Sequence, residues 1–249
     1  MKKTQGFKRL TQGLSALAGG LLLSSAVQAE GELHLYNWSD YMPQALLDKF
    51  AEQYDVKVTQ DTYDSNETLL AKLKSGVKGY DVAVPGDYMV AIMVKEGLLE
   101  NIHANKLSNF SKVKKDLINV YFDEGREYSV PYQFGTTAFM VDTAVYGGDI
   151  NTLDILFNPP AELKGKINMF RDVNDVINAA LRYKGYETCN ANRKELKEVN
   201  DMLKTASENW LSIQSDGARE MLVSGDAAVS MVWNGMALRA RQEKASLQY

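Results

Sequence analysis

The chain has 249 residues, with 28 Lys and Arg against 32 Asp and Glu, two His and one Cys. The acidic excess disfavours a nucleic-acid partner, and the single Cys189 excludes a disulfide within the chain. No nucleophile elbow, phosphate loop or HExxH motif occurs, so the sequence does not favour an enzyme, a cofactor or a bound metal.

The first 29 residues are predicted to form a secretory signal peptide. Four basic residues precede an apolar stretch at 14–23, and Ala26-Val27-Gln28-Ala29 places small residues for cleavage before Glu30. A membrane anchor is the alternative, but the stretch is shorter than the roughly 20 residues needed to cross a bilayer. No cysteine follows the cleavage site to accept a lipid. We therefore expect a periplasmic protein that is not embedded in the membrane, with a formal charge of −8 over the remaining residues.

Strands and helices alternate in the first half of the chain. The predicted elements are a strand at 32–36, a helix at 43–54, a strand at 56–63, a helix capped by Asp64-Ser65 that ends near Gly76, and a strand at 81–84. This β-α-β-α-β order predicts an α/β fold with a mostly parallel sheet. In such sheets ligands bind beyond the carboxyl ends of the strands.

The second half continues this pattern. The predicted elements are strands at 128–132, 138–141 and 227–233 and a charged helix at 187–208. We place a crossing between two lobes near Gly135 to Ala138. The predicted organisation is a signal peptide at 1–29, a first lobe at 30–137 and a second lobe at 138–249.

Aromatic and acidic side chains come together where two predicted strands end, in Trp38-Ser39-Asp40-Tyr41 and Gly86-Asp87-Tyr88. A flexible polyamine requires this combination. Each ammonium group needs a carboxylate or the face of an aromatic ring, and each methylene segment needs a flat apolar wall.

Five sequence segments follow one another in a recognisable order over residues 32–245. They are YNWSDY at 36–41, DSNET at 64–68, YDVAVP at 80–85, SVPY at 129–132 and VWNG at 232–235. In this order the chain resembles the periplasmic spermidine/putrescine-binding family. The resemblance implies a two-lobed binding-protein fold, with a mixed, mostly parallel sheet in each lobe and a ligand cleft between the lobes.

The resemblance also implies a set of ligand-binding residues. They are Trp38, Ser39, Asp40, Tyr41 and Tyr88 from the first lobe, and Asp172, Asp175 and Trp233 from the second. The two acids of the second lobe are three residues apart at a predicted helix start, which puts both carboxylates on one face.

Each of these residues has a structural alternative. Trp38 and Trp233 could be core residues, because large aromatic side chains are mostly buried. Asp172 and Asp175 could complement a helix dipole, and Asp40 could cap the helix that begins at Pro43.

The chain departs from the family pattern in several places. Gly86 stands where spermidine-preferring relatives have a hydroxyl residue, Asp87 is an additional acid, and Asp175 replaces the usual glutamate. The family also continues beyond the position of Tyr249, through a further strand and acidic pocket position and back into the first lobe. We therefore expect a fragment or a truncated product in which both lobes are incomplete.

The predicted function is capture of putrescine or spermidine by a monomer that delivers it to the inner-membrane permease of an ABC importer. The alternatives are a polyamine-sensing subunit that presents its closed form to a membrane sensor and, less favoured, an exported enzyme. The sequence does not indicate which polyamine is preferred.

Overall fold

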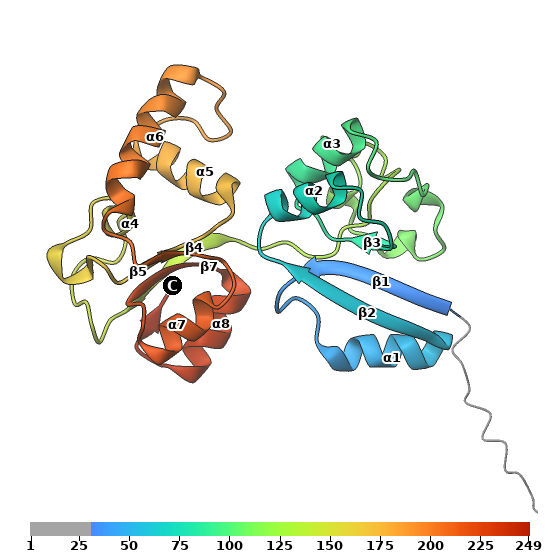
Figure 1. The fold of residues 1–249 in the computed structure, drawn as a ribbon, viewed down its shortest axis with the longest axis horizontal. Helices are drawn as coiled ribbons and strands as arrows, with labels where there is room; N and C mark the ends of the chain where they lie inside the picture. The colour runs from blue at the N-terminus through green and yellow to red at the C-terminus, as the bar shows by residue number, and fades with distance from the viewer. Residues whose placement is uncertain (1–30) are drawn as a thin grey trace, which may run out of the picture.

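The computed structural model describes residues 31–249, so the predicted signal peptide and its cleavage site before Glu30 lie outside the described part. Within that part the strands form two sheets, each with its own helices, and the two bodies lie side by side (Figure 1). No helix of residues 31–249 is long and apolar enough to cross a bilayer.

The first sheet is parallel, with strand order β2-β1-β3. Its strands are β1 (Gly31–Trp38), β2 (Val56–Tyr63) and β3 (Val82–Ala83), and its helices are α1 (Gln44–Tyr54), α2 (Asn66–Lys74) and α3 (Asp87–Lys95). Trp38 is level with Tyr63 in the register, so β1 and β2 end at the same edge of the sheet. This is the edge where a parallel sheet is expected to bind a ligand.

The second sheet is mixed, with strand order β6-β5-β7-β4-β8. Its strands are β4 (Thr137–Asp142), β5 (Ile167–Met169), β6 (Ser212–Ile213), β7 (Val229–Trp233) and β8 (Leu247–Gln248). β5 runs parallel to β6 and β7, whereas β4 runs antiparallel to β7 and β8.

Helices cover both faces of the second sheet. They are α4 (Asp154–Phe157), α5 (Val173–Tyr183), α6 (Arg193–Ser207), α7 (Ala218–Ser224) and α8 (Asn234–Glu243). Figure 1 shows α5 and α6 on one side of this sheet and α7 and α8 on the other. Short 3₁₀ turns, at Ala104–Lys106, Phe110–Lys112, Lys115–Leu117 and Ala161–Leu163, complete the described secondary structure.

Each body has a separate apolar core. The larger core lies in the second body, where Met140, Ile167, Val229 and Leu247 are almost fully buried in the sheet. The smaller core lies around Trp38 in the first body. Burying one such side chain contributes about 1.5–3 kcal/mol, so each sheet has its own source of stability.

The predicted α/β fold with a parallel first sheet is confirmed, and most predicted elements differ from the observed ones by a few residues. The predicted cap of α2 is also confirmed, since the Ser65 Oγ accepts a hydrogen bond from the Thr68 N–H at 3.2 Å. The strand expected at 81–84 has only two residues.

The strand predicted at 128–132 is wrong, because this segment is irregular. The carboxylate of Asp123 accepts hydrogen bonds from the N–H groups of Glu127, Tyr128 and Ser129. These backbone donors are therefore satisfied by a side chain and not by a neighbouring strand, which a local apolar pattern could not reveal.

The helix predicted at 187–208 begins only at Arg193. Asn192 caps it, its side chain accepting a hydrogen bond from the Lys194 N–H at 3.0 Å. Gly185 and Cys189 have positive φ angles of 76° and 57°, and this left-handed backbone keeps the preceding residues out of the helix.

Candidate functional site

The first lobe contributes an aromatic wall at the end of β1. The Trp38 Nε1 donates a hydrogen bond to the Val84 carbonyl at 2.8 Å, and the Tyr63 hydroxyl donates to the same oxygen. The two rings lie 4.8 Å apart, and Trp38 is only 7 % exposed. Trp38 therefore packs in the first core, in agreement with the alternative interpretation that it is a core residue. Its ring also reaches the second lobe.

Trp233, at the end of β7, meets this wall from the other lobe. Its ring lies edge to face with Trp38 at a centroid distance of 5.5 Å, and its other neighbours are Tyr41 at 6.0 Å and Phe170 at 4.5 Å. Strand ends from two separate sheets thus bring together aromatic rings that are almost 200 positions apart in the sequence.

Asp172 and Asp175 lie beside these rings at the start of α5. Asp172 is the N-cap residue, and its Oδ1 accepts a hydrogen bond from the Asp175 N–H at 3.2 Å. This agrees with the alternative interpretation, in which Asp172 stabilises the start of a helix. Asp175 faces the aromatic residues, and its Oδ2 accepts hydrogen bonds from Thr137 Oγ1 at 3.0 Å and Trp233 Nε1 at 3.3 Å. One carboxylate therefore caps the helix, and the other is held against a ring.

The electrostatics of this acid pair are unusual. Burial, followed by the charge of Asp175, raises the pKa of Asp172 from 3.8 to about 6, and burial also raises the pKa of Asp175. Neither carboxylate forms an ion pair with a Lys, Arg or His of residues 31–249. A buried and a partly buried carboxylate of this kind strongly favour a cation in their vicinity.

Tyr88, in the first turn of α3, adds a ring close to the same acids. Its hydroxyl donates a hydrogen bond to Glu67 Oε1 at 3.1 Å. Burial, with the nearby charges of Asp172 and Glu67, raises the pKa of this hydroxyl. Tyr88 therefore remains a neutral hydrogen-bond donor next to the acid pair.

Asn66 links the two lobes and was not identified from the sequence. Its Oδ1 accepts a hydrogen bond from the Gly86 N–H at 2.8 Å, and its Nδ2 donates to Asp172 Oδ2 at 3.3 Å. A Cβ atom on Gly86 would lie 2.9 Å from this Nδ2. The absence of a side chain at Gly86 thus gives Asn66 room to reach Asp172. The sequence signals for Asn66 were its place after the cap Ser65 and its position within the DSNET segment at 64–68.

The side chains of Asp40 and Ser39 face polar groups of the second lobe. The Asp40 carboxylate pairs with Arg239 of α8 at 3.5 Å, and both side chains are about half exposed. Ser39 acts on Asp216, a residue of the second lobe. Burial raises the pKa of Asp216, and the Ser39 hydroxyl partly offsets this rise. The proposed capping role of Asp40 is wrong, because α1 follows Pro43 without a side-chain cap.

A second ion pair crosses between the lobes close to the acid pair. Arg171, just before the N-cap of α5, lies with its Nη1 3.4 Å from Asp64 Oδ2. Both cross-lobe ion pairs place an acid on the first lobe and an arginine on the second.

The predicted residues therefore fall into two groups. We call the first group the inter-lobe cluster, and it consists of Trp38, Tyr41, Tyr88, Asp172, Asp175 and Trp233. Ser39 and Asp40 form the second group, at the rim beside α8.

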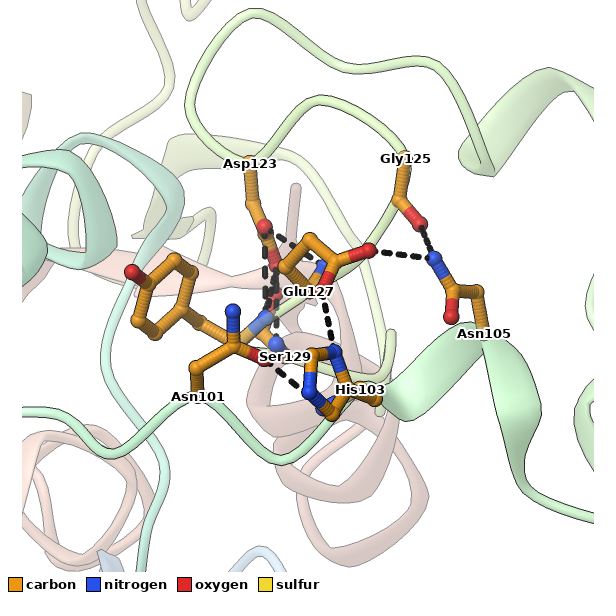
Figure 2. Close-up of polar contacts among 8 residues, drawn as sticks. Asn101, His103, Asn105, Asp123, Gly125, Glu127 and Ser129 are labelled. Atoms are coloured by element: carbon orange, nitrogen blue, oxygen red, sulfur yellow. Dashed lines mark hydrogen bonds and ion pairs between the residues drawn. The ribbon is translucent and has the colours of Figure 1, made fainter.

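The two histidines lie outside the inter-lobe cluster. The His103 Nδ1 lies 2.6 Å from Glu127 Oε2, and the Asn105 Nδ2 donates a hydrogen bond to the other oxygen of Glu127 (Figure 2). The Ser129 hydroxyl donates to Asp123 at 2.7 Å, and no hydrogen bond of the described residues joins it to His103. His34 lies in β1 and contacts Thr59 at 2.7 Å. The loop around His103 thus has a structural role.

Within residues 31–249 no group of three or more His, Cys, Asp or Glu residues is arranged to hold a metal ion. The inter-lobe cluster offers carboxylates, phenol groups and indole rings. This chemistry suits an organic cation with an apolar chain.

The chain matches the family of bacterial extracellular solute-binding proteins over residues 45–249. It is 38% identical over 230 residues to the spermidine/putrescine-binding periplasmic protein of Escherichia coli (strain K12), covering 90% of this chain and 66% of that protein. It is 32% identical over 247 residues to the putrescine-binding periplasmic protein SpuD of Pseudomonas aeruginosa, covering 94% of this chain and 67% of that protein.

A solved structure is also similar. That of a spermidine/putrescine ABC transporter from Listeria monocytogenes has a TM-score of 0.81 and 30% sequence identity, over 88% of this chain and 67% of that one. The chain thus spans about two thirds of the length of the relatives that it matches.

Proposed function

The chain belongs to the family of bacterial extracellular solute-binding proteins, and from this premise we propose that it captures a polyamine between its two lobes. The observation that carries the proposal is the acid pair of Asp172 and Asp175. Asp172 is buried and Asp175 is partly buried, both lack a basic partner within residues 31–249, and Asp175 lies against the Trp233 ring.

A polyamine satisfies each part of this arrangement. Its ammonium group supplies the missing charge at Asp172 and Asp175, and its methylene chain packs against Trp38 and Trp233. A cation over an aromatic ring gains about 0.5–2 kcal/mol, depending on how far water is excluded. The names of the relatives from E. coli and P. aeruginosa support the same ligand class.

Binding between the lobes requires movement. The Trp38 and Trp233 rings are in direct contact, so a methylene chain enters between them only when the lobes separate. We place the lobe boundary between Thr137 and Ala138, one residue into β4 and close to the irregular segment that precedes this strand. In this segment the Thr136 carbonyl accepts a hydrogen bond from the Asn234 N–H at 3.0 Å. Favourable contacts on both lobes then stabilise the closed form with ligand.

The biological role follows from the family. We propose that the protein acts as a monomer in the periplasm and delivers its ligand to the inner-membrane permease of an ABC importer. The relatives are periplasmic by name, and the similar Listeria protein is described as an ABC transporter. The family is one of solute-binding proteins, so this function involves no catalysis.

Calorimetric titration of the exported protein with putrescine, cadaverine and spermidine tests the proposal. We expect saturable binding of at least one of these amines with one site per chain. Glutamate and glucose are the controls, since neither carries two ammonium groups. A protein that is folded by circular dichroism and binds none of the three amines would contradict the proposal.

A further inference from the structure

Two short segments, one from each lobe, meet where α2 and α5 begin. Asp64 of the first lobe lies 3.4 Å from Arg171 of the second, and the Asn66 Nδ2 donates a hydrogen bond to Asp172 Oδ2 at 3.3 Å. The Arg171 side chain is 61 % exposed, whereas Asn66 and Asp172 are only 3 % and 4 % exposed. An ion pair in water contributes little, so the buried hydrogen bond is the stronger of these two links between the lobes.

Gly86 fixes which end of the Asn66 amide faces Asp172. The Gly86 N–H can only donate, so the amide oxygen of Asn66 accepts from it at 2.8 Å and the Nδ2 faces Asp172. The other oxygen of Asp172 accepts from the Asp175 N–H at 3.2 Å. Both oxygens of Asp172 therefore act as acceptors, as in an ionised carboxylate. A hydrogen bond to the ionised form is roughly twice as strong as one to the neutral form.

The surroundings of Asp172 oppose its ionised form when no ligand is bound. Its titratable neighbours come from α5, α2, α3 and the loop after β1, and they are Asp175, Glu67, Tyr88 and Tyr41. Burial and the charges of the two acids raise the pKa of Asp172, and the Asn66 amide acts against this rise. An ammonium group beside Asp172 offsets the negative charges, so it favours the ionised carboxylate.

We propose that Asn66 is a positioning residue that couples the charge of the ligand to lobe closure, because its amide holds Asp172 most strongly when an ammonium group keeps that carboxylate ionised. The inference rests on the proposed function. The hydrogen bond joins the two lobes, so it forms only in the closed protein, and strengthening it stabilises the closed form. A diamine therefore favours closure through this bond, whereas an uncharged molecule of the same length does not.

Asn66→Leu in the full chain tests this role, since leucine has a similar volume and no donor for Asp172. In the ligand-free protein, an NMR titration of isotope-labelled aspartate carboxyl groups, assigned with Asp172→Asn, should show the midpoint of Asp172 at least about 0.5 pH units higher. Calorimetry should show an affinity for putrescine at least about tenfold lower. X-ray scattering should show a smaller decrease of the radius of gyration when putrescine is added.

A second variant and a control separate this role from packing. Asn66→Thr keeps a hydroxyl that can accept from the Gly86 N–H but is too short to span both contacts, so it should give the same changes even if Asn66→Leu does not fold. Asp64→Asn, which weakens the neighbouring ion pair and leaves Asn66 in place, is the matched control. It should not raise the midpoint of Asp172, and should lower the affinity by less than about twofold. Melting temperatures show which variants are folded.

Other outcomes would overturn the inference. An unchanged midpoint in the folded variants would show that Asn66 does not act on the charge of Asp172. A raised midpoint with wild-type affinity and closure would show that the bond does not stabilise the liganded form. If the folded wild type binds no amine, the proposed function fails and the inference fails with it. If the wild type binds putrescine and the Asn66 variants bind it equally well, only the inference fails.

Discussion

Trp38 and Trp233 belong to different sheets and meet edge to face with their ring centroids 5.5 Å apart. Each ring is also fixed within its own lobe, Trp38 by a hydrogen bond to the Val84 carbonyl and Trp233 by packing on Phe170. The contact between the indole rings therefore reports directly on the distance between the lobes.

Tryptophan fluorescence should detect ligand binding through this contact. The chain has three tryptophans, and Trp210 lies apart from the cluster, with its Nε1 bonded to the Leu156 carbonyl. We expect putrescine to change the emission of the wild type and of Trp210→Phe, and to have little effect on the variant that combines Trp38→Phe with Trp233→Phe, in which only Trp210 remains. A change that disappears only in Trp210→Phe would contradict the placement of the ligand.

Truncation of Trp38 should affect folding as well as binding. Its side chain is 7 % exposed and packs on Tyr63, so Trp38→Ala should lower the free energy of unfolding by about 3–5 kcal/mol. Urea denaturation of the ligand-free protein measures this loss. A loss below about 1 kcal/mol would show that Trp38 lines the ligand site without stabilising the core.

The affinity for polyamines should fall as the pH is lowered through about 6. The pKa of Asp172 is raised to about 6, mainly by burial, so this carboxylate is increasingly neutral below that pH. Binding of an ammonium group near pH 6 should therefore release a proton. Calorimetry in buffers of different ionisation enthalpy measures this release, and Asp172→Asn should abolish most of it. An unchanged proton release in that variant would assign the titration to another group.

The same shift has an effect on the ligand-free protein. A carboxyl group whose pKa is higher in the folded state contributes stability that is present below its unfolded value of 3.8 and is lost as the pH rises through about 6. Relative to Asp172→Asn, the wild type should thus lose stability between these pH values. Melting curves of both proteins across this range provide the comparison, and parallel curves would contradict it.

A buried ion pair in the second lobe should be important for stability. Asp142 is almost fully buried and lies 2.8 Å from Lys244. Burial alone would raise its pKa, but hydrogen bonds from Lys244 and Ser246 keep the pKa below 3.8. Lys244→Met should cost about 3–5 kcal/mol at pH 7, because it leaves a buried charge unpaired. Lys197→Met is the matched control, because Lys197 is exposed and pairs with Asp201.

The pH dependence of that variant provides a further check. A group with a lowered folded pKa contributes stability that is present above its unfolded value and is lost as the pH falls through the folded one. The difference between the wild type and Lys244→Met should therefore shrink below pH 3.8. A difference that does not depend on pH would attribute the loss to packing.

The sequence predicted the elements of the first lobe well, because α1 has apolar residues on one face, β2 is rich in β-branched residues and α2 has a polar cap. It failed at 128–132, where Asp123 accepts hydrogen bonds from backbone N–H groups four to six residues away. Sequence similarity identified the residues of the inter-lobe cluster. The DSNET segment contains Asn66, but the sequence could not reveal its contact with Asp172 or that of Arg239 with Asp40, because each partner lies on the opposite lobe and is distant in sequence.

The central claim is that Asp172 and Asp175 bind an ammonium group between the lobes, and a pair of nearly isosteric ligands tests it most directly. Putrescine and 1,4-butanediol share a four-carbon chain and differ in having ammonium or hydroxyl ends. We predict that the wild type binds putrescine at least about 100-fold more tightly than the diol, and that Asp172→Asn combined with Asp175→Asn removes most of this difference. A double variant that is folded and still discriminates between the two ligands as the wild type does would contradict the account.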